Sequence, residues 1–261
     1  MVKALPKLEI NKGFVDWEPD DANGARVFDG EWISAVPGLP TGKAPLFEDA
    51  RILWFEERLG GFSGHNVLEL GSLEGGHTYM MTRRGATVLA IESNVRAWLR
   101  CLVVKEAVGI SGATFLLGDF NKFLGSNRGF TFALASGVLY HQPDPVGFLE
   151  KLCQSAPLLG IWTHYFDASQ LEKRSYSKAR FNVNPRTVAS RKGRFVRLFE
   201  QKYLSDLKRK RFCGGYAAGS FWLSRDDILA VLGDEGFLCE TVEEPDHPSG
   251  PALCIFARKT S

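Results

Sequence analysis

The sequence has 261 residues, of which 44% are hydrophobic and 24% charged, and its formal net charge is +2. This composition is typical of a globular chain with room for one large domain or two small ones. It contains no apolar run near the roughly 18 residues that a bilayer-spanning helix needs. The first twelve residues lack the apolar core of a signal peptide, so we expect a cytoplasmic protein with no membrane partner.

Charge is distributed unevenly along the chain. Residues 167–222 hold 14 Lys and Arg against 4 Asp and Glu, whereas the remainder holds 18 against 26. A basic segment on an acidic body predicts that one region meets an anion. The five cysteines are scattered, and each except Cys213 lies in an apolar run, which indicates reduced core residues. No His, Cys or carboxylate cluster has the spacing of metal ligands, so we expect no metal.

Residues 1–44 are rich in proline and glycine and allow two interpretations. They form either an extended arm that packs on the domain or a lid over a substrate pocket. In the first case the anchoring side chains are aromatic: Phe14, Trp17, Phe28 and Trp32. A helix is expected over 46–59, where apolar residues recur at helical spacing before Gly60 and Gly61 end it.

Strands and helices then alternate. Apolar runs predict strands over 67–70, 87–91, 114–117, 131–134 and 158–162. Between them, helices are expected over 77–84, over 94–108 with Ser93 as the cap, and over 145–154 with a proline in the first turn. This order, with apolar strands, indicates a parallel sheet that is covered on both faces.

The basic segment interrupts this alternation. Within it, aromatic and aliphatic residues among Lys and Arg predict a basic amphipathic helix over 194–211. After it, Ser224 is expected to cap a helix that ends near residue 234. Strands are expected over 237–242 and 252–257, and the short turn between them requires an antiparallel pair.

The stretch over 67–76 runs from a buried strand into glycines and then into a helix. Gly75 and Gly76 have no Cβ, so a nucleotide-like ligand can approach the backbone and the free N–H groups of the helix start. Glu69 lies late in this strand and can accept hydrogen bonds from an amino-bearing ligand. Glu92 ends the second strand, where a carboxylate can accept both hydroxyls of a ribose, although a surface acid is the alternative.

Together with Gly118-Asp119-Phe120 after the third strand and the terminal hairpin, these features resemble the class I S-adenosylmethionine-dependent methyltransferases. The resemblance covers about residues 45–166 and 223–258. Leu73 departs from the family pattern because it replaces the middle glycine of the first motif. The resemblance implies an α/β fold, a Rossmann-like, doubly wound, mostly parallel seven-stranded sheet with a C-terminal antiparallel hairpin strand. The expected domains are an N-terminal arm or lid (1–44), a methyltransferase domain (45–166 plus 223–261) and a basic, substrate-binding insertion (167–222).

The resemblance also implies the cofactor S-adenosyl-L-methionine and the residues that bind it. Asp119 would accept the adenine amino group and Phe120 would stack on the base, although Asp119 can also cap a helix. Ser136, after the fourth strand, would contact the methionine part or only pack there. The complete expected set is Glu69, Gly71, Ser72, Leu73, Gly75, His77, Glu92, Ser93, Gly118, Asp119, Phe120 and Ser136.

Methyl transfer is an in-line attack on a sulfonium carbon, so the protein mainly aligns the reactants and excludes water. A base is needed only for an un-ionised hydroxyl or amine acceptor, and His141 is the best candidate because imidazole titrates near neutrality. Tyr140 could hydrogen-bond the acceptor. The alternative for His141 is a hydrogen-bonded structural histidine in the loop, and the alternative for Tyr140 is packing in the core. The residues expected to bind the substrate, with arginines clamping an anion, are Tyr165, Arg174, Arg180 and Arg186.

The favoured hypothesis is an S-adenosylmethionine-dependent methyltransferase enzyme for a small, anionic or hydroxyl-bearing metabolite. The alternative is a tRNA-modifying (carboxy)methyltransferase, because 137–141 is similar to the matching segment of the wobble-uridine carboxymethyltransferases and the insertion is basic. A non-catalytic cofactor-binding protein is a third possibility, motivated by Leu73. A nicotinamide oxidoreductase is disfavoured by Asp119 and the hairpin. Neither the acceptor atom nor the oligomeric state follows from the sequence.

Overall fold

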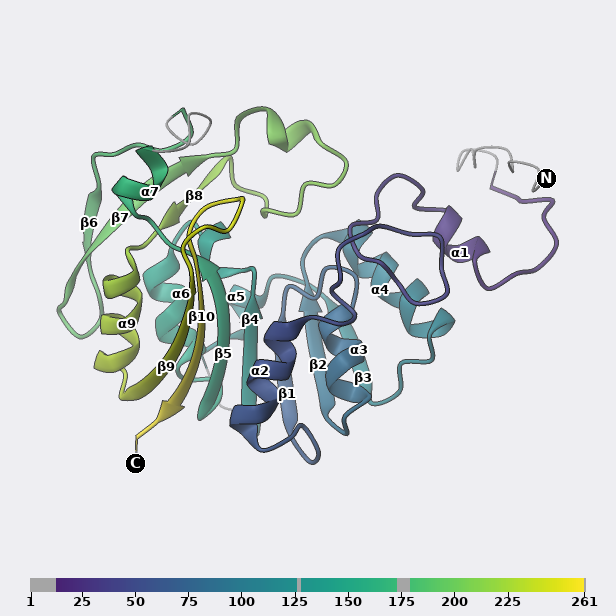
Figure 1. Ribbon diagram of the computed structural model, residues 1–261, viewed down its shortest axis with the longest axis horizontal. Coiled ribbons are helices and arrows are strands. Elements are labelled where there is room, and N and C mark those ends of the chain that lie inside the picture. Colours follow the sequence, from purple (N-terminus) through teal and green to yellow (C-terminus); the bar gives the residue numbers. More distant parts are fainter. Residues whose placement is uncertain (1–12, 126–127, 173–178, 261) are drawn as a thin grey trace.

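The computed structural model describes residues 13–125, 128–172 and 179–260. A seven-stranded sheet with the order β3-β2-β1-β4-β5-β10-β9 forms its centre (Figure 1). Strands β1 to β5 are parallel, and β10 runs antiparallel to both β5 and β9. The predicted Rossmann-like sheet with a C-terminal antiparallel hairpin is therefore confirmed. Its strands are β1 (Asn66–Leu70), β2 (Thr87–Glu92), β3 (Ala113–Leu117), β4 (Phe132–Ser136), β5 (Leu158–His164), β9 (Phe237–Glu244) and β10 (Ala252–Lys259).

Helices cover both faces of this sheet because neighbouring strand residues alternate between two apolar cores. Val67 packs in the core beneath α2 (Ala50–Leu59), α3 (Gly76–Thr82) and α4 (Val95–Ala107). Leu68 packs in the core beneath α6 (Pro145–Leu152) and α9 (Arg225–Asp234). The shorter helices are α1 (Asn23–Arg26), α5 (Phe120–Phe123) and α7 (Ala168–Glu172). In the described residues no helix is long and apolar enough to cross a membrane.

Capping side chains determine where these helices begin. The helix expected from residue 46 begins at Ala50, because the Asp49 side chain accepts a hydrogen bond from the N–H of Arg51. The predicted Ser93 cap is wrong. Asn94 occupies the N-cap position of α4, and its side chain accepts from two N–H groups of the first turn. Ser224 caps α9 as predicted.

The predicted basic helix over 194–211 is wrong. This segment forms β7 (Phe195–Lys202) and a 3₁₀ helix, η3 (Leu204–Lys208). With β6 (Arg186–Ala189) and β8 (Gly219–Trp222), β7 makes a separate antiparallel sheet. The burial has a period of two: Val196 and Leu198 are buried while Phe195 is 77% exposed. The same apolar residues also match helical spacing, so periodicity alone could not distinguish the two.

The N-terminal segment packs on the domain through some of the expected aromatics. Phe28 and Trp32 are buried, whereas Phe14 is 91% exposed and does not anchor the segment. Trp17 lies under the guanidinium of Arg26, 5.9 Å from its ring centroid. The segment is further connected to the domain by a buried ion-pair network beside the glycine turn.

Arg100 lies at the centre of that network and is 3% exposed. Its guanidinium lies 3.4 Å from the Glu31 carboxylate and 3.2 Å from that of Glu74. Glu74 also accepts hydrogen bonds from the backbone N–H groups of Ile33 (3.0 Å) and Ser34 (2.7 Å). The N-terminal segment and the glycine turn are thus held by the same side chains.

Candidate functional site

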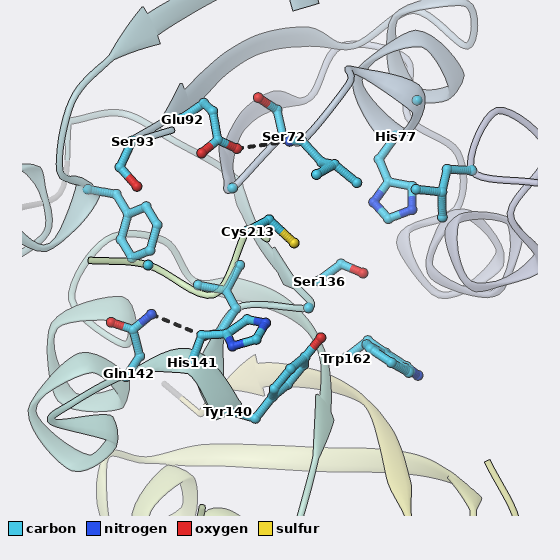
Figure 2. Close-up of a pocket in the computed structure, with 18 of the residues that line it drawn as sticks. Ser72, His77, Glu92, Ser93, Ser136, Tyr140, His141, Gln142, Trp162 and Cys213 are labelled. Carbon is cyan, nitrogen blue, oxygen red and sulfur yellow. Dashed lines mark hydrogen bonds between the residues drawn. The ribbon is translucent and has the colours of Figure 1, made fainter. Parts of the chain in front are cut away.

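A cavity of about 620 Å³ opens at the carboxyl ends of the parallel strands. Figure 2 shows residues from several elements pointing into it. They come from the turn after β1, the end of β2, the start of α5, the end of β4 and the 3₁₀ helix η2 (Leu139–His141). Ligands of open α/β sheets bind at this edge, and the volume is that of a small-molecule site.

The glycine turn forms one wall of the cavity. Gly71 has a φ of 70°, and a Cβ there would lie 3.0 Å from Val138. A Cβ on Gly76 would lie 2.6 Å from the backbone oxygen of Leu46. Leu73, which also lines the cavity, has a φ of 52°, a left-handed conformation that favours glycine. The turn therefore keeps the backbone shape of a glycine turn although a leucine occupies this position.

We expect Leu73→Gly to raise the free energy of unfolding by about 1 kcal/mol, because glycine adopts this backbone conformation without the steric cost that leucine bears. Leu73→Ala is the matched control: it removes the side chain but keeps a Cβ, and should lower stability. Urea unfolding of the three proteins measures the difference. A glycine variant less stable than the wild type would show that the leucine side chain outweighs the backbone conformation.

Glu92 faces the turn from the end of β2. Its carboxylate accepts hydrogen bonds from the backbone N–H groups of Leu73 (2.9 Å) and Asn94 (2.8 Å). Burial raises the pKa of Glu92, and these donors oppose the rise. The bonds orient a carboxylate that is 8% exposed and lines the cavity, as Figure 2 shows.

Asp119 and Phe120 line the cavity at the start of α5. The Asp119 side chain accepts from the N–H of Asn121 (2.9 Å) and is the N-cap of this helix. One carboxylate oxygen therefore has a structural partner, and the side chain still faces the cavity. Capping and ligand binding are compatible at this position.

The structure brings most of the expected cofactor residues together. The cavity is lined by Gly71, Ser72, Leu73, His77, Glu92, Ser93, Asp119, Phe120 and Ser136. Glu69, Gly75 and Gly118 do not line it. Glu69 is 2% exposed and accepts a hydrogen bond from the Thr78 hydroxyl behind the turn. Burial raises the pKa of Glu69.

Both expected catalytic residues, Tyr140 and His141, line the cavity from η2. The Tyr140 ring contacts Trp162, His164 and Trp222, with centroids 4.7 to 6.1 Å apart. Burial raises the pKa of Tyr140, so the phenol stays protonated. Burial also lowers the pKa of His141 to about 3, which leaves a neutral imidazole at neutral pH.

The residues expected to bind substrate lie elsewhere. Tyr165 is 5% exposed in the core, and Arg186 lies over the Phe221 ring, 4.7 Å from its centroid. Arg180 pairs with Asp206. None of these three lines the cavity, and Arg174 lies outside the described residues.

Two other arginines of the insertion also pair with carboxylates. Arg191 pairs with Glu235, and Arg194 pairs with Asp234. Part of the basic segment therefore meets the acidic body of the same chain. This internal pairing accounts for some of the charge asymmetry seen in the sequence.

Sequence reasoning missed the wall formed by the start of α2 and by β5, β9 and their loops. Burial opposes ionisation of Asp49, but hydrogen bonds from His77 and Arg51 lower the pKa of Asp49 well below its usual range. The Arg51 guanidinium lies 4.4 Å from the centroid of the Trp162 ring. The Trp162 indole donates to Glu244 (3.3 Å). In sequence, Asp49 lies inside the helix expected over 46–59, which gives no sign of a site.

The β7–β8 loop supplies a further unexpected wall. Cys213, Gly215, Tyr216 and Ala217 line the cavity. The loop is held across the site by Arg211, which donates to the backbone oxygen of Gly30 (2.8 Å). Cys213 was the one cysteine outside an apolar run, and Figure 2 shows it in the cavity wall. Across the described residues, no group of three His, Cys, Asp or Glu side chains could hold a metal.

Comparisons with known proteins identify the fold. No family model matches the sequence, and no curated protein matches it significantly. The N-terminal domain of EvdMO1, solved in the presence of S-adenosylhomocysteine and D-fucose, has a TM-score of 0.67 at 20% identity and covers 91% of this chain and 94% of its own. Magnesium protoporphyrin IX methyltransferase (ChlM) from Synechocystis PCC 6803, with S-adenosylhomocysteine bound, has a TM-score of 0.57 at 15% identity, with 81% of each chain covered. An S-adenosylmethionine-dependent methyltransferase from Mesorhizobium loti has a TM-score of 0.57 at 16% identity and covers 82% of this chain and 100% of its own. The chain has the fold of the class I S-adenosylmethionine-dependent methyltransferases.

Proposed function

We propose that the protein is an enzyme that transfers a methyl group from S-adenosylmethionine to a small molecule. The observation that carries this proposal is that Glu92, Asp119 and the glycine turn meet in one cavity of this fold. Glu92 would accept the ribose hydroxyls, Asp119 the adenine amino group, and the turn would hold the amino-acid end. When bound, the sulfonium supplies an electrophilic methyl carbon, and the protein's walls orient the acceptor and exclude water.

The charge of the cavity favours a hydroxyl-bearing acceptor over an anionic one. Five carboxylates line it, whereas in the described part of the chain Arg51 is the one Lys or Arg that does, and it is paired with Asp49. An anionic acceptor would meet like charges with no free cation to offset them. For a neutral, hydroxyl-bearing acceptor, the rings of Tyr140 and Trp162 offer an apolar surface. The carboxylates are those of Glu48, Asp49, Glu92, Asp119 and Glu244.

A small acceptor is also favoured over tRNA. The volume of about 620 Å³ suits a small ligand beside the cofactor. Arg191 and Arg194, which could contact a nucleic-acid backbone, are paired with carboxylates. Structures of similar fold include enzymes named for porphyrin and 1,6-didemethyltoxoflavin methylation.

Transfer of a labelled methyl group tests the proposed function. The protein is incubated with methyl-labelled S-adenosylmethionine and a cell extract that has been separated into small-molecule and RNA fractions. We expect label in the small-molecule fraction. Label in the tRNA would support the alternative function, and label in neither fraction with retained cofactor binding would indicate a non-catalytic protein.

Asp119→Asn should lower the affinity for S-adenosylhomocysteine about tenfold, or about 1.4 kcal/mol. Asparagine still caps α5, but it replaces an acceptor oxygen with a donor and loses the charge. Asp144→Asn is the matched control, because Asp144 caps α6 and lies outside the cavity. Calorimetry should give wild-type affinity for the control. Wild-type affinity in Asp119→Asn would exclude Asp119 from adenine recognition.

A further inference from the structure

His141 has one ring nitrogen toward the protein and one toward the cavity. Its Nδ1 lies 2.8 Å from the hydroxyl oxygen of Tyr203. Tyr203 follows β7 in the insertion, is 3% exposed and does not line the cavity. In the described part of the chain Nε2 has no hydrogen-bond partner, and it is not among the fully buried, unpaired polar atoms. Since His141 lines the cavity, Nε2 is the nitrogen that a ligand can reach.

The hydrogen between the two residues belongs to Tyr203. A buried tyrosine hydroxyl uses its hydrogen in a bond. The Tyr203 hydroxyl has two neighbours: His141 Nδ1 at 2.8 Å, and the Ser220 side chain, whose hydrogen bond opposes the burial that raises the pKa of Tyr203. The neighbouring Ser220 hydroxyl donates to Gln201 Oε1 (3.2 Å), which also accepts from the Trp222 indole (3.2 Å). At 2.8 Å the imidazole nitrogen is a stronger acceptor than the Ser220 hydroxyl oxygen, so Tyr203 donates to Nδ1, and Nδ1 accepts with its lone pair.

We propose that Tyr203 holds His141 in the tautomer with its hydrogen on Nε2, so that His141 presents a hydrogen-bond donor to the cavity and not a base. A neutral imidazole carries one hydrogen, and if Nδ1 accepts, that hydrogen lies on Nε2. The ring is neutral because burial lowers the pKa of His141, as described above.

This tautomer changes the role expected of His141 in catalysis. With Nδ1 bonded and Nε2 protonated, the imidazole has no free lone pair and cannot remove a proton from the acceptor. Its N–H would instead bind one lone pair of an acceptor oxygen and leave another to attack the methyl carbon, while the proton of a hydroxyl acceptor would pass to a carboxylate that lines the cavity, such as Glu48 or Glu244. This role rests on the proposed function, whereas the tautomer does not. Tyr203 is then a positioning residue, and it connects the insertion to the site.

Nuclear magnetic resonance of the imidazole nitrogens tests the proposal in the full-length protein without cofactor or substrate. Long-range proton–nitrogen spectra distinguish a pyridine-like from a pyrrole-like nitrogen, and His141→Gln identifies the signals among the five histidines. At neutral pH we expect His141 to have a pyridine-like Nδ1 and a pyrrole-like Nε2. A pyrrole-like Nδ1, or a doubly protonated ring, would overturn the proposal.

Tyr203→Phe should shift the His141 signals toward a mixture of tautomers, because phenylalanine cannot donate to Nδ1. Tyr216→Phe is the matched control: it removes a tyrosine hydroxyl from the cavity wall, and no hydrogen bond joins Tyr216 to His141 in the described structure. Its spectrum should match the wild type. Unchanged His141 signals in Tyr203→Phe would contradict the positioning role. If Tyr203→Phe does not fold, the wild-type spectrum alone decides the tautomer. Failure of the wild-type protein to bind S-adenosylhomocysteine would refute the proposed function, but it would not change the tautomer that these spectra report.

Discussion

Glu92→Ala is expected to lower the affinity for S-adenosylhomocysteine about 100-fold, or about 2.7 kcal/mol. Both ribose hydroxyls would lose a charged acceptor, and each such hydrogen bond is worth about 1.5–3 kcal/mol. The N–H groups of Leu73 and Asn94 would also lose their acceptor, so the shape of the turn would be less well defined. Calorimetric titration measures the change.

Two control variants separate these effects. Glu92→Gln keeps an oxygen for one backbone N–H but loses the charge, and should lie between the wild type and the alanine variant. Glu106→Ala removes the same residue type from the exposed surface of α4 and should bind like the wild type. If Glu92→Ala bound as tightly as Glu106→Ala, the ribose assignment would be wrong.

Arg100→Ala should lower the free energy of unfolding by about 3–5 kcal/mol. The Glu31 and Glu74 carboxylates, 5% and 1% exposed, would be left buried without their shared cation. Because Glu74 binds the backbone of Ile33 and Ser34, the N-terminal segment should also become more susceptible to proteolysis. Urea unfolding and limited proteolysis measure these two effects.

Arg96→Ala is the matched control. Arg96 also pairs with Glu31, at 2.6 Å, but its side chain is 46% exposed, so its loss should cost less than about 1 kcal/mol. Equal destabilisation by the two variants would mean that the buried position of Arg100 has no special importance. The comparison therefore isolates the effect of burial on one network.

The sheet could be predicted from the sequence because each central strand is an apolar run that glycines or a cap terminate. Apolar spacing gave the wrong prediction of a helix over 194–211, because Phe195, Leu198 and Phe199 match the spacing of both a helix and a strand. The sheet partners β6 and β8 decide between them, and the periodicity of one segment does not show which strands pair with it.

The cofactor side of the site could be predicted for a related reason. Glu92 is the last residue of β2 and Asp119 lies just beyond the end of β3, and the carboxyl ends of these parallel strands meet at one edge of the sheet. The opposite wall depends on antiparallel pairing, in which Ala252 faces both His164 and Glu244. Only this register brings residues far apart in sequence to the same edge. Likewise, the sequence shows the charge of Arg191 but not its partner Glu235.

Calorimetric titration of the wild-type protein with S-adenosylhomocysteine tests whether this cavity binds the cofactor. We expect saturable binding at one site per chain, with an affinity in the micromolar range. Glu92→Ala and Asp119→Asn should weaken this binding, whereas Glu106→Ala and Asp144→Asn should not. An absence of heat at millimolar ligand, or binding that all four variants leave unchanged, would contradict the assignment of this cavity to S-adenosylmethionine.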